Sequence, residues 1–161
     1  MRYLKRISFL AFTAIFLMGA ATKETGITKG IQPGNLAPEL NLQGLNLING
    51  KDYVLLQFWA AYDGTSRAMN TQMHNVIAHL GTDNIRLASV SMDESSAVYE
   101  GIVKADGLNP ATQFNEPAGK HAAIFKAYRL NSGFGNWLIN PEGIIIAKDV
   151  HPKEIAGYIS D

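Results

Sequence analysis

The 161-residue chain contains no cysteine. This absence excludes disulfide bonds, thiolate metal sites, iron–sulfur clusters and thiol nucleophiles. The chain also lacks an excess of charge of either sign, because 14 lysine and arginine residues stand against 14 aspartate and glutamate residues. The sequence also contains no block of like charge that would attract nucleic acid or an anionic membrane surface. Partners must therefore be sought at a local site of the folded protein.

The first 21 residues have the pattern of a secretory signal peptide. Residues 1–6 carry three positive charges, residues 7–18 form an apolar run of twelve, and the small residues Gly, Ala and Ala follow. A membrane anchor is the alternative, but twelve helical residues reach only ~18 Å of a ~30 Å bilayer core. Ala20 stands where a lipoprotein would need its lipidated cysteine, so the chain as written cannot be lipidated there. Export predicts a location in the periplasm or cell envelope of a bacterium, with membrane contact only through this signal.

Cleavage after residue 21 would leave 11 basic and 14 acidic groups, a net charge of −3. Residues 22–33 are polar and contain glycine without a sustained period, which predicts a linker. The folded domain is then residues 34–161. Its length and its apolar content predict a single compact core.

Within this domain, apolar runs of strand length alternate with helical stripes. Strands are predicted over 53–59, 85–92, 136–140 and 144–149, with a short edge pair among Leu40, Leu42, Leu45 and Leu47. Helices are predicted over 64–81, 95–106, 119–128 and 152–159, with Val98, Tyr99, Ile102 and Val103 facing inward in the second. The alternation, which ends in a hairpin, predicts an α/β sandwich with a mixed sheet.

Three segments of the domain resemble the thioredoxin-fold proteins. Residues 58–67, Phe-Trp-Ala-Ala-Tyr-Asp-Gly-Thr-Ser-Arg, end a buried strand and begin a helix. They are similar to the family's active-site segment, Phe-Trp-Ala-x-Trp-Cys-Gly-Pro-Cys-Arg. Residues 34–40 and 137–143 resemble the Gly-x-x-Ala-Pro-x-Phe and Phe-Leu-Ile-Asp-x-x-Gly motifs of the TlpA/ResA-like, AhpC/TSA-related branch. The resemblance implies a thioredoxin-like three-layer sandwich, with a central mixed β-sheet and helices on both faces.

The residues that perform the family's chemistry are the ones that differ. Asp63 and Ser66 occupy the positions of the two cysteines, and Thr65 that of the proline between them. A carboxylate and a hydroxyl cannot form or exchange disulfides, so this resemblance implies a domain without thiol-disulfide oxidoreductase activity. Asp63 does suit the start of a helix, where an anionic side chain accepts bonds from unpaired backbone N–H groups.

The loop before the hairpin also departs from the family. The family has a cis-proline beside its active site, and the matching position here lies at or near Phe134, where no proline occurs. A cis peptide before a residue other than proline costs about 2.5–4 kcal/mol, so the loop is predicted to be trans. Phe134 then becomes a candidate to line the binding groove.

The histidines offer no metal site by spacing. His74 and His79 lie about 140° apart around one helix at ~100° per residue, and His121 and His151 stand alone, so no metal or cofactor is predicted. Ser66 would need a base within ~2.6–3.2 Å to act as a nucleophile. Only His121 or His151 could be brought there by the fold.

Two hypotheses follow. The first is a secreted thioredoxin-like protein that binds a protein or peptide, but not nucleic acid, without redox chemistry. The second is an enzyme with rebuilt chemistry around Asp63, Ser66 and a distant histidine, or a residual role associated with envelope thiol-disulfide systems. Arg67 is expected to reach outward to a partner or to Asp63, and Trp59 either packs in the core or walls the groove. The binding surface of the first hypothesis comprises Tyr62, Asp63, Gly64, Thr65, Ser66, Arg67 and Phe134.

Overall fold

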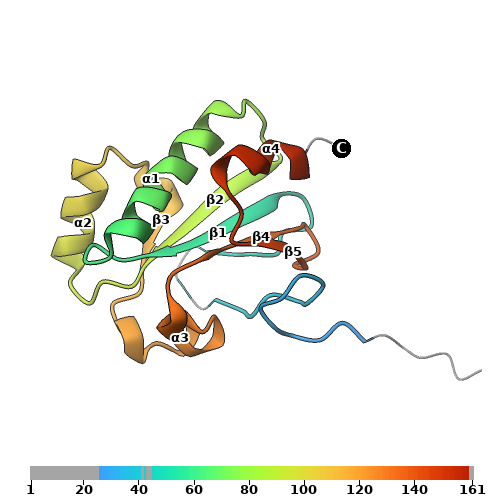
Figure 1. The fold of residues 1–161 in the computed structure, drawn as a ribbon, viewed down its shortest axis with the longest axis horizontal. Helices are drawn as coiled ribbons and strands as arrows, with labels where there is room; N and C mark the ends of the chain where they lie inside the picture. Colours follow the sequence, from blue (N-terminus) through green and yellow to red (C-terminus); the bar gives the residue numbers. More distant parts are fainter. Residues whose placement is uncertain (1–25, 41, 43–44, 160–161) are drawn as a thin grey trace, which may run out of the picture.

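The computed structural model describes residues 26–40, 42 and 45–159, so the predicted signal peptide lies outside the described residues. A five-stranded sheet has the order β3-β2-β1-β4-β5 (Figure 1). The first three strands pair in parallel, whereas β4 and β5 continue the sheet antiparallel. This mixed sheet confirms the predicted fold class. The strands are β1 (Tyr53–Trp59), β2 (Ile85–Ser91), β3 (Gln113–Asn115), β4 (Asn136–Ile139) and β5 (Ile145–Lys148).

Helices cover both faces of the sheet (Figure 1). Alternate residues of β1 point to opposite faces, so Leu55 packs with Met73 of α1 while Phe58 lies in the other core cluster with Ile124 of α3. None of the helices in the described residues is long and apolar enough to cross a membrane. The helices are α1 (Gly64–His79), α2 (Ser96–Ala105), α3 (Ala123–Ala127) and α4 (Ile155–Tyr158).

Four expectations about local structure need correction. The predicted edge pair is wrong for the described residues, because Leu45 donates a backbone bond to Leu42 and closes a turn there. The predicted helix over 119–128 is broken at Ala122, whose backbone is extended. Val98 is 45% exposed rather than inward. Strand β3 was not predicted, since three residues are too few to show a period.

Residues 29–38 pack against the rest of the domain and are held there by hydrogen bonds. Ile31, at the end of the predicted linker, is buried in the core, and its carbonyl accepts a bond from Trp137 Nε1 at 3.0 Å. Isolated β-bridges join Leu36 to Lys29 and to Ile144. The Tyr128 hydroxyl donates to the carbonyl of Pro38 at 2.7 Å. These contacts pack this segment against the face of the sheet that α3 covers.

Candidate functional site

Asp63 lies at the junction of β1 and α1, where the resembled motif has its first cysteine. Its backbone is extended, and its Oδ1 accepts a bond from the Ser66 backbone N–H at 2.8 Å. This bond satisfies one of the N–H groups that a helix start leaves unpaired. The prediction that Asp63 is a helix cap is confirmed.

Ser66 occupies the second cysteine position and is only 5% exposed. Its hydroxyl donates to the Asp63 carbonyl at 3.2 Å and accepts from the Ala60 N–H at 3.4 Å. The side chain therefore stabilises the start of α1, and its burial keeps it from the contact surface.

Histidines do not supply the base that an activated Ser66 or Asp63 would need. His151 lines a cavity together with Ser66, but its Nδ1 accepts a bond from the Lys153 N–H at 3.2 Å. His74 accepts from the backbone of Asn109. Across the described residues, no hydrogen bond joins an imidazole to Asp63 or Ser66. The hypothesis of rebuilt catalysis thus lacks a positioned base.

Arg67 is paired within the domain. Its Nε and Nη2 donate to the two carboxylate oxygens of Asp106 at 2.7 and 2.5 Å. These hydrogen bonds lower the pKa of the Asp106 carboxyl. The expectation that Arg67 reaches a partner or Asp63 is corrected, because Asp106 at the end of α2 satisfies the guanidinium; this bidentate pair ties α2 to the first turn of α1.

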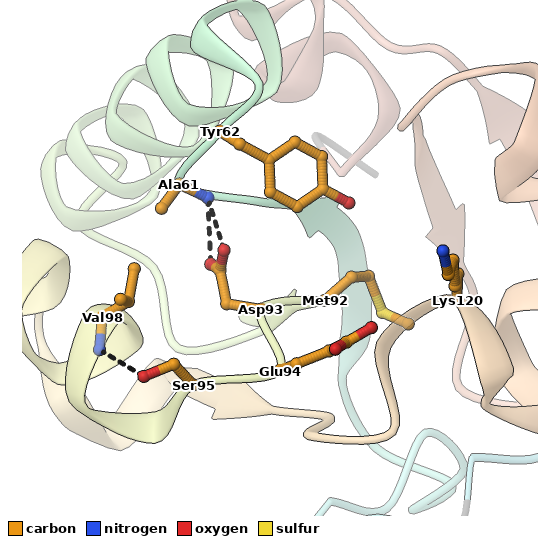
Figure 2. Close-up of a pocket in the computed structure, with 8 residues that line it drawn as sticks. All are labelled: Ala61, Tyr62, Met92, Asp93, Glu94, Ser95, Val98 and Lys120. Carbon is orange, nitrogen blue, oxygen red and sulfur yellow. Dashed lines mark hydrogen bonds between the residues drawn. The ribbon is translucent and has the colours of Figure 1, made fainter.

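Tyr62 stands at the rim of a cavity of about 460 Å³ at the carboxyl ends of β1 and β2 (Figure 2). Tyr62 is 73% exposed, and Val98 of α2, which also lines the cavity, is 45% exposed. Glu94 and Lys120 also line the cavity, and Figure 2 draws them on the side away from Val98. Burial raises the pKa of the Tyr62 phenol, and the carboxylates of Asp93, Asp63 and Glu94 raise it further.

Asp93 holds together the two loops that form this cavity, and the sequence analysis did not identify this residue. Although only 5% exposed, its carboxylate accepts the Ala61 N–H at 3.1 and 2.9 Å and the Ser91 hydroxyl at 2.7 Å. Figure 2 shows the carboxylate below the turn that carries Tyr62. An acid directly after a buried strand was the only signal in the sequence. Asp93 holds the loop after β2 against the turn after β1.

Phe134 lies beside Tyr62, with ring centroids 6.2 Å apart. All peptide bonds of the described residues are trans, so the predicted trans loop at Phe134 is confirmed. Gly133, with φ +121°, provides a backbone conformation that other residues rarely adopt. The structure thus brings together Tyr62 and Phe134, two of the predicted contact residues, while Gly64 and Thr65 are exposed in the first turn of α1.

Beneath α1, the sheet buries polar side chains that sequence reasoning also missed. Asn70 Oδ1 accepts from the Ser89 hydroxyl at 2.5 Å, and Asn70 Nδ2 donates to Gln113 at 3.0 Å. Gln57 is 1% exposed, and its Oε1 has no partner.

Trp59 is fully buried, which assigns it to the core rather than to the groove wall. Among the described residues, no group of three or more His, Asp or Glu side chains could hold a metal ion.

Solved structures with similar folds place the chain in a family. A thioredoxin-like protein from Parabacteroides distasonis ATCC 8503 is 42% identical and covers 84% of this chain and 99% of its own, with a TM-score of 0.80. A thiol-disulfide oxidoreductase from Bacteroides fragilis NCTC 9343 is 22% identical, covers 68% of this chain and 80% of its own, and has a TM-score of 0.58. StoA from Bacillus subtilis is 17% identical, covers 68% of this chain and 84% of its own, and has a TM-score of 0.57.

No protein-family model and no curated protein matches the chain. The two more distant structures share the fold, which agrees with the predicted thioredoxin-like architecture. The Parabacteroides protein is similar enough over nearly its whole length to show the family. The chain belongs to the thioredoxin-like proteins, and it carries Asp63 and Ser66 where the resembled motif has its two cysteines.

Proposed function

We propose that this protein is a redox-inactive, exported thioredoxin-like module that binds a protein or peptide segment at the surface around Tyr62 and Phe134. The observation that carries this proposal is the exposure of Tyr62. The residue is 73% exposed at the rim of a cavity, and its ring lies next to a second aromatic ring. An aromatic side chain at the centre of an interface often dominates its binding energy.

The rest of the site supports binding rather than chemistry. Asp63 and Ser66 are engaged in capping α1, and a chain without cysteine has no thiol for exchange. Burying about 100–150 Å² of the Tyr62 ring would contribute about 2.5–4 kcal/mol before the costs of association. Val98, which lines the same cavity and is exposed, extends this apolar contact.

The test selects peptides from a displayed random library on the purified protein and measures their dissociation constants. Tyr62→Ala is expected to weaken binding by about 2 kcal/mol, or about 30-fold. Tyr158→Ala is the matched control, because Tyr158 is an exposed tyrosine on α4, outside the site. Failure to select any peptide, or equal losses in the two variants, would contradict the proposal.

The redox part of the proposal is tested separately. The purified protein should reduce or oxidise a model disulfide no faster than the uncatalysed reaction. Catalysis above that rate would show that the assignment of Asp63 and Ser66 to the two cysteine positions misses the reactive group. The peptide-binding measurement tests the binding part of the proposal, and the rate measurement tests its redox part, so each part can be refuted without the other.

A further inference from the structure

The turn that leads into β1 contains the single Asn-Gly pair of the sequence, Asn49–Gly50. Both residues are exposed. Asparagine is a thermolabile residue, because the backbone nitrogen of the following residue can attack its side-chain amide. A following glycine hinders this attack least, since it has no Cβ atom. The pair is therefore the position at which the covalent structure of this chain changes most easily by itself.

This reaction, deamidation, needs only water. The Gly50 nitrogen forms a bond to Asn49 Cγ while the Cγ–Nδ2 bond breaks, and the proton of the Gly50 N–H leaves with Nδ2 as ammonia. The product is a cyclic imide. Water then cleaves one of the two imide C–N bonds, which leaves either aspartate or isoaspartate at position 49. Both products carry a new negative charge, and isoaspartate also lengthens the backbone by one methylene group.

The folded turn engages both reacting groups. The Gly50 N–H donates to the carbonyl of Pro141 at 3.2 Å, so the attacking nitrogen keeps its proton in a hydrogen bond. Asn49 Nδ2, the leaving group, donates to Asp52 Oδ2 at 2.7 Å. Asn49 Oδ1 accepts the backbone N–H groups of Lys51 and Asp52 at 3.0 and 2.9 Å. Rotation of the amide toward the Gly50 nitrogen strains or breaks these bonds, which slows the attack.

The two residues that react are also the two that build the turn. Gly50 has φ +67°, a backbone conformation that other residues adopt only with strain. The N–H groups of Lys51 and Asp52 need the acceptor that the Asn49 side chain provides. The turn geometry therefore keeps a reactive pair in place, and its hydrogen bonds limit the reaction.

Conversion of Asn49 would disturb a contact between distant parts of the chain. The turn rests on the connection between β4 and β5, through the bond from Gly50 to Pro141 and through Ile48. A Cβ atom built on Gly143 would lie 2.5 Å from Ile48 Cδ1, so this side chain packs directly against the backbone there. Aspartate at position 49 would replace the hydrogen bond to Asp52 with two neighbouring carboxylates, which repel each other.

We propose that Asn49 is a site of spontaneous deamidation whose rate is set by the folded turn, with Asp52 as the residue that restrains it. The proposal does not rest on the binding function, because the turn lies at the amino end of β1 and Tyr62 follows the carboxyl end. Its consequence is a slow chemical change that weakens the seat of this turn on the β4–β5 connection.

The experiment incubates the purified protein in one mildly alkaline buffer, either folded or unfolded in guanidinium chloride, and follows deamidation at each asparagine by peptide mapping. In the unfolded chain, Asn49 should react first, and folding should slow it at least about tenfold. Asn46 is the internal reference, because it is exposed in the same loop but is followed by leucine, and it should react much more slowly in the unfolded chain.

Asp52→Ala should raise the rate at Asn49 in the folded protein by about threefold to tenfold and leave the rate in the unfolded chain unchanged. Asp52→Asn keeps an acceptor and should raise it less. Asp83→Ala, at an exposed aspartate outside the turn, is the matched control and should not change it. Asn49→Asp imitates one product and should lower the urea midpoint, and adding Asp52→Asn should restore part of the loss.

Equal rates at Asn49 in the folded and unfolded chains would overturn the proposal. An unfolded chain that reacts first at another asparagine would overturn it as well. If Asp52→Ala raised the rate equally in guanidinium chloride, the effect would belong to the local sequence, and the assigned role of Asp52 would be wrong. Should Asp52→Ala fail to fold, the ratio of folded to unfolded rates in the unmodified protein and in Asp52→Asn still decides the question.

Discussion

Replacing Asp63 separates its role as a helix cap from any role in binding. The Asp63 Oδ1 bond to the Ser66 N–H is 2.8 Å long and stands at the start of a 16-residue helix. Asp63→Ala removes this bond and should lower the free energy of unfolding by about 1 kcal/mol, within a range of about 0.5–2. Asp63→Asn keeps an acceptor and loses only the attraction between the charge and the helix dipole, about 0.3–1 kcal/mol.

Urea unfolding measures the difference. With a denaturant slope of about 2 kcal/mol/M, Asp63→Ala should move the midpoint down by about 0.5 M, and Asp63→Asn by a smaller amount, about 0.15 M at the lower end of its range. In 1 M NaCl, where the screening length falls to ~3 Å, the difference between aspartate and asparagine should shrink while that between asparagine and alanine persists. Asp83→Ala is the control, because Asp83 is exposed and lies outside the helices.

An Asp63→Ala variant as stable as the unmodified protein would refute the cap assignment. Equal losses for Asp63→Ala and Asp63→Asn would show that charge, rather than the hydrogen bond, stabilises this end of α1. Either result would reopen the question of why the cysteine position holds an acid.

Two further predictions follow from neighbouring features. Asp63→Cys combined with Ser66→Cys should create a dithiol that oxidises, which is measured as loss of free thiol. The pair should exchange poorly with peptide disulfides, because Phe134 stands where the resemblance places a cis-proline. A pair that stays reduced would show that the alignment of these positions is shifted. Burial raises the pKa of Tyr128 above its usual value. The folded phenol therefore stays protonated when the unfolded one ionises, so stability is retained below about pH 10 and falls above it. Urea midpoints between pH 8 and 11 should drop less for Tyr128→Phe, which at pH 8 loses about 1 kcal/mol with its bond to Pro38.

Local patterns in the sequence predicted the parts of the fold that local patterns control. The apolar run of β1, the helical stripe of α1 and the acid at the α1 start each depend on neighbouring residues, and the structure confirms all three. Strand β3 depends instead on pairing with β2, with Ser89 opposite Gln113, and leaves no period of its own. Strand β3 was therefore not predicted, because a pairing between strands distant in the sequence leaves no local pattern.

The hydrogen-bond partners of charged side chains could not be predicted from the sequence for a similar reason. Arg67 bonds to Asp106, 39 residues away, and Asp93 bonds to Ala61, 32 residues away. Periodicity and capping rules describe contacts within one or two turns, so they offered Arg67 only Asp63 or an external partner. The resemblance placed the candidate site at the end of β1, but only the folded chain showed which side chains there are exposed.

The cap at Asp63 also limits how a partner can be recognised. In a dithiol site, the unpaired N–H groups at the start of the helix favour a thiolate. Here a carboxylate of the chain itself bonds to one of these groups and places its negative charge at the helix end. An anionic group of a partner would meet that charge at short range and would be disfavoured. Recognition should then depend on the exposed Tyr62 and on Phe134, whose aromatic rings favour apolar or cationic groups.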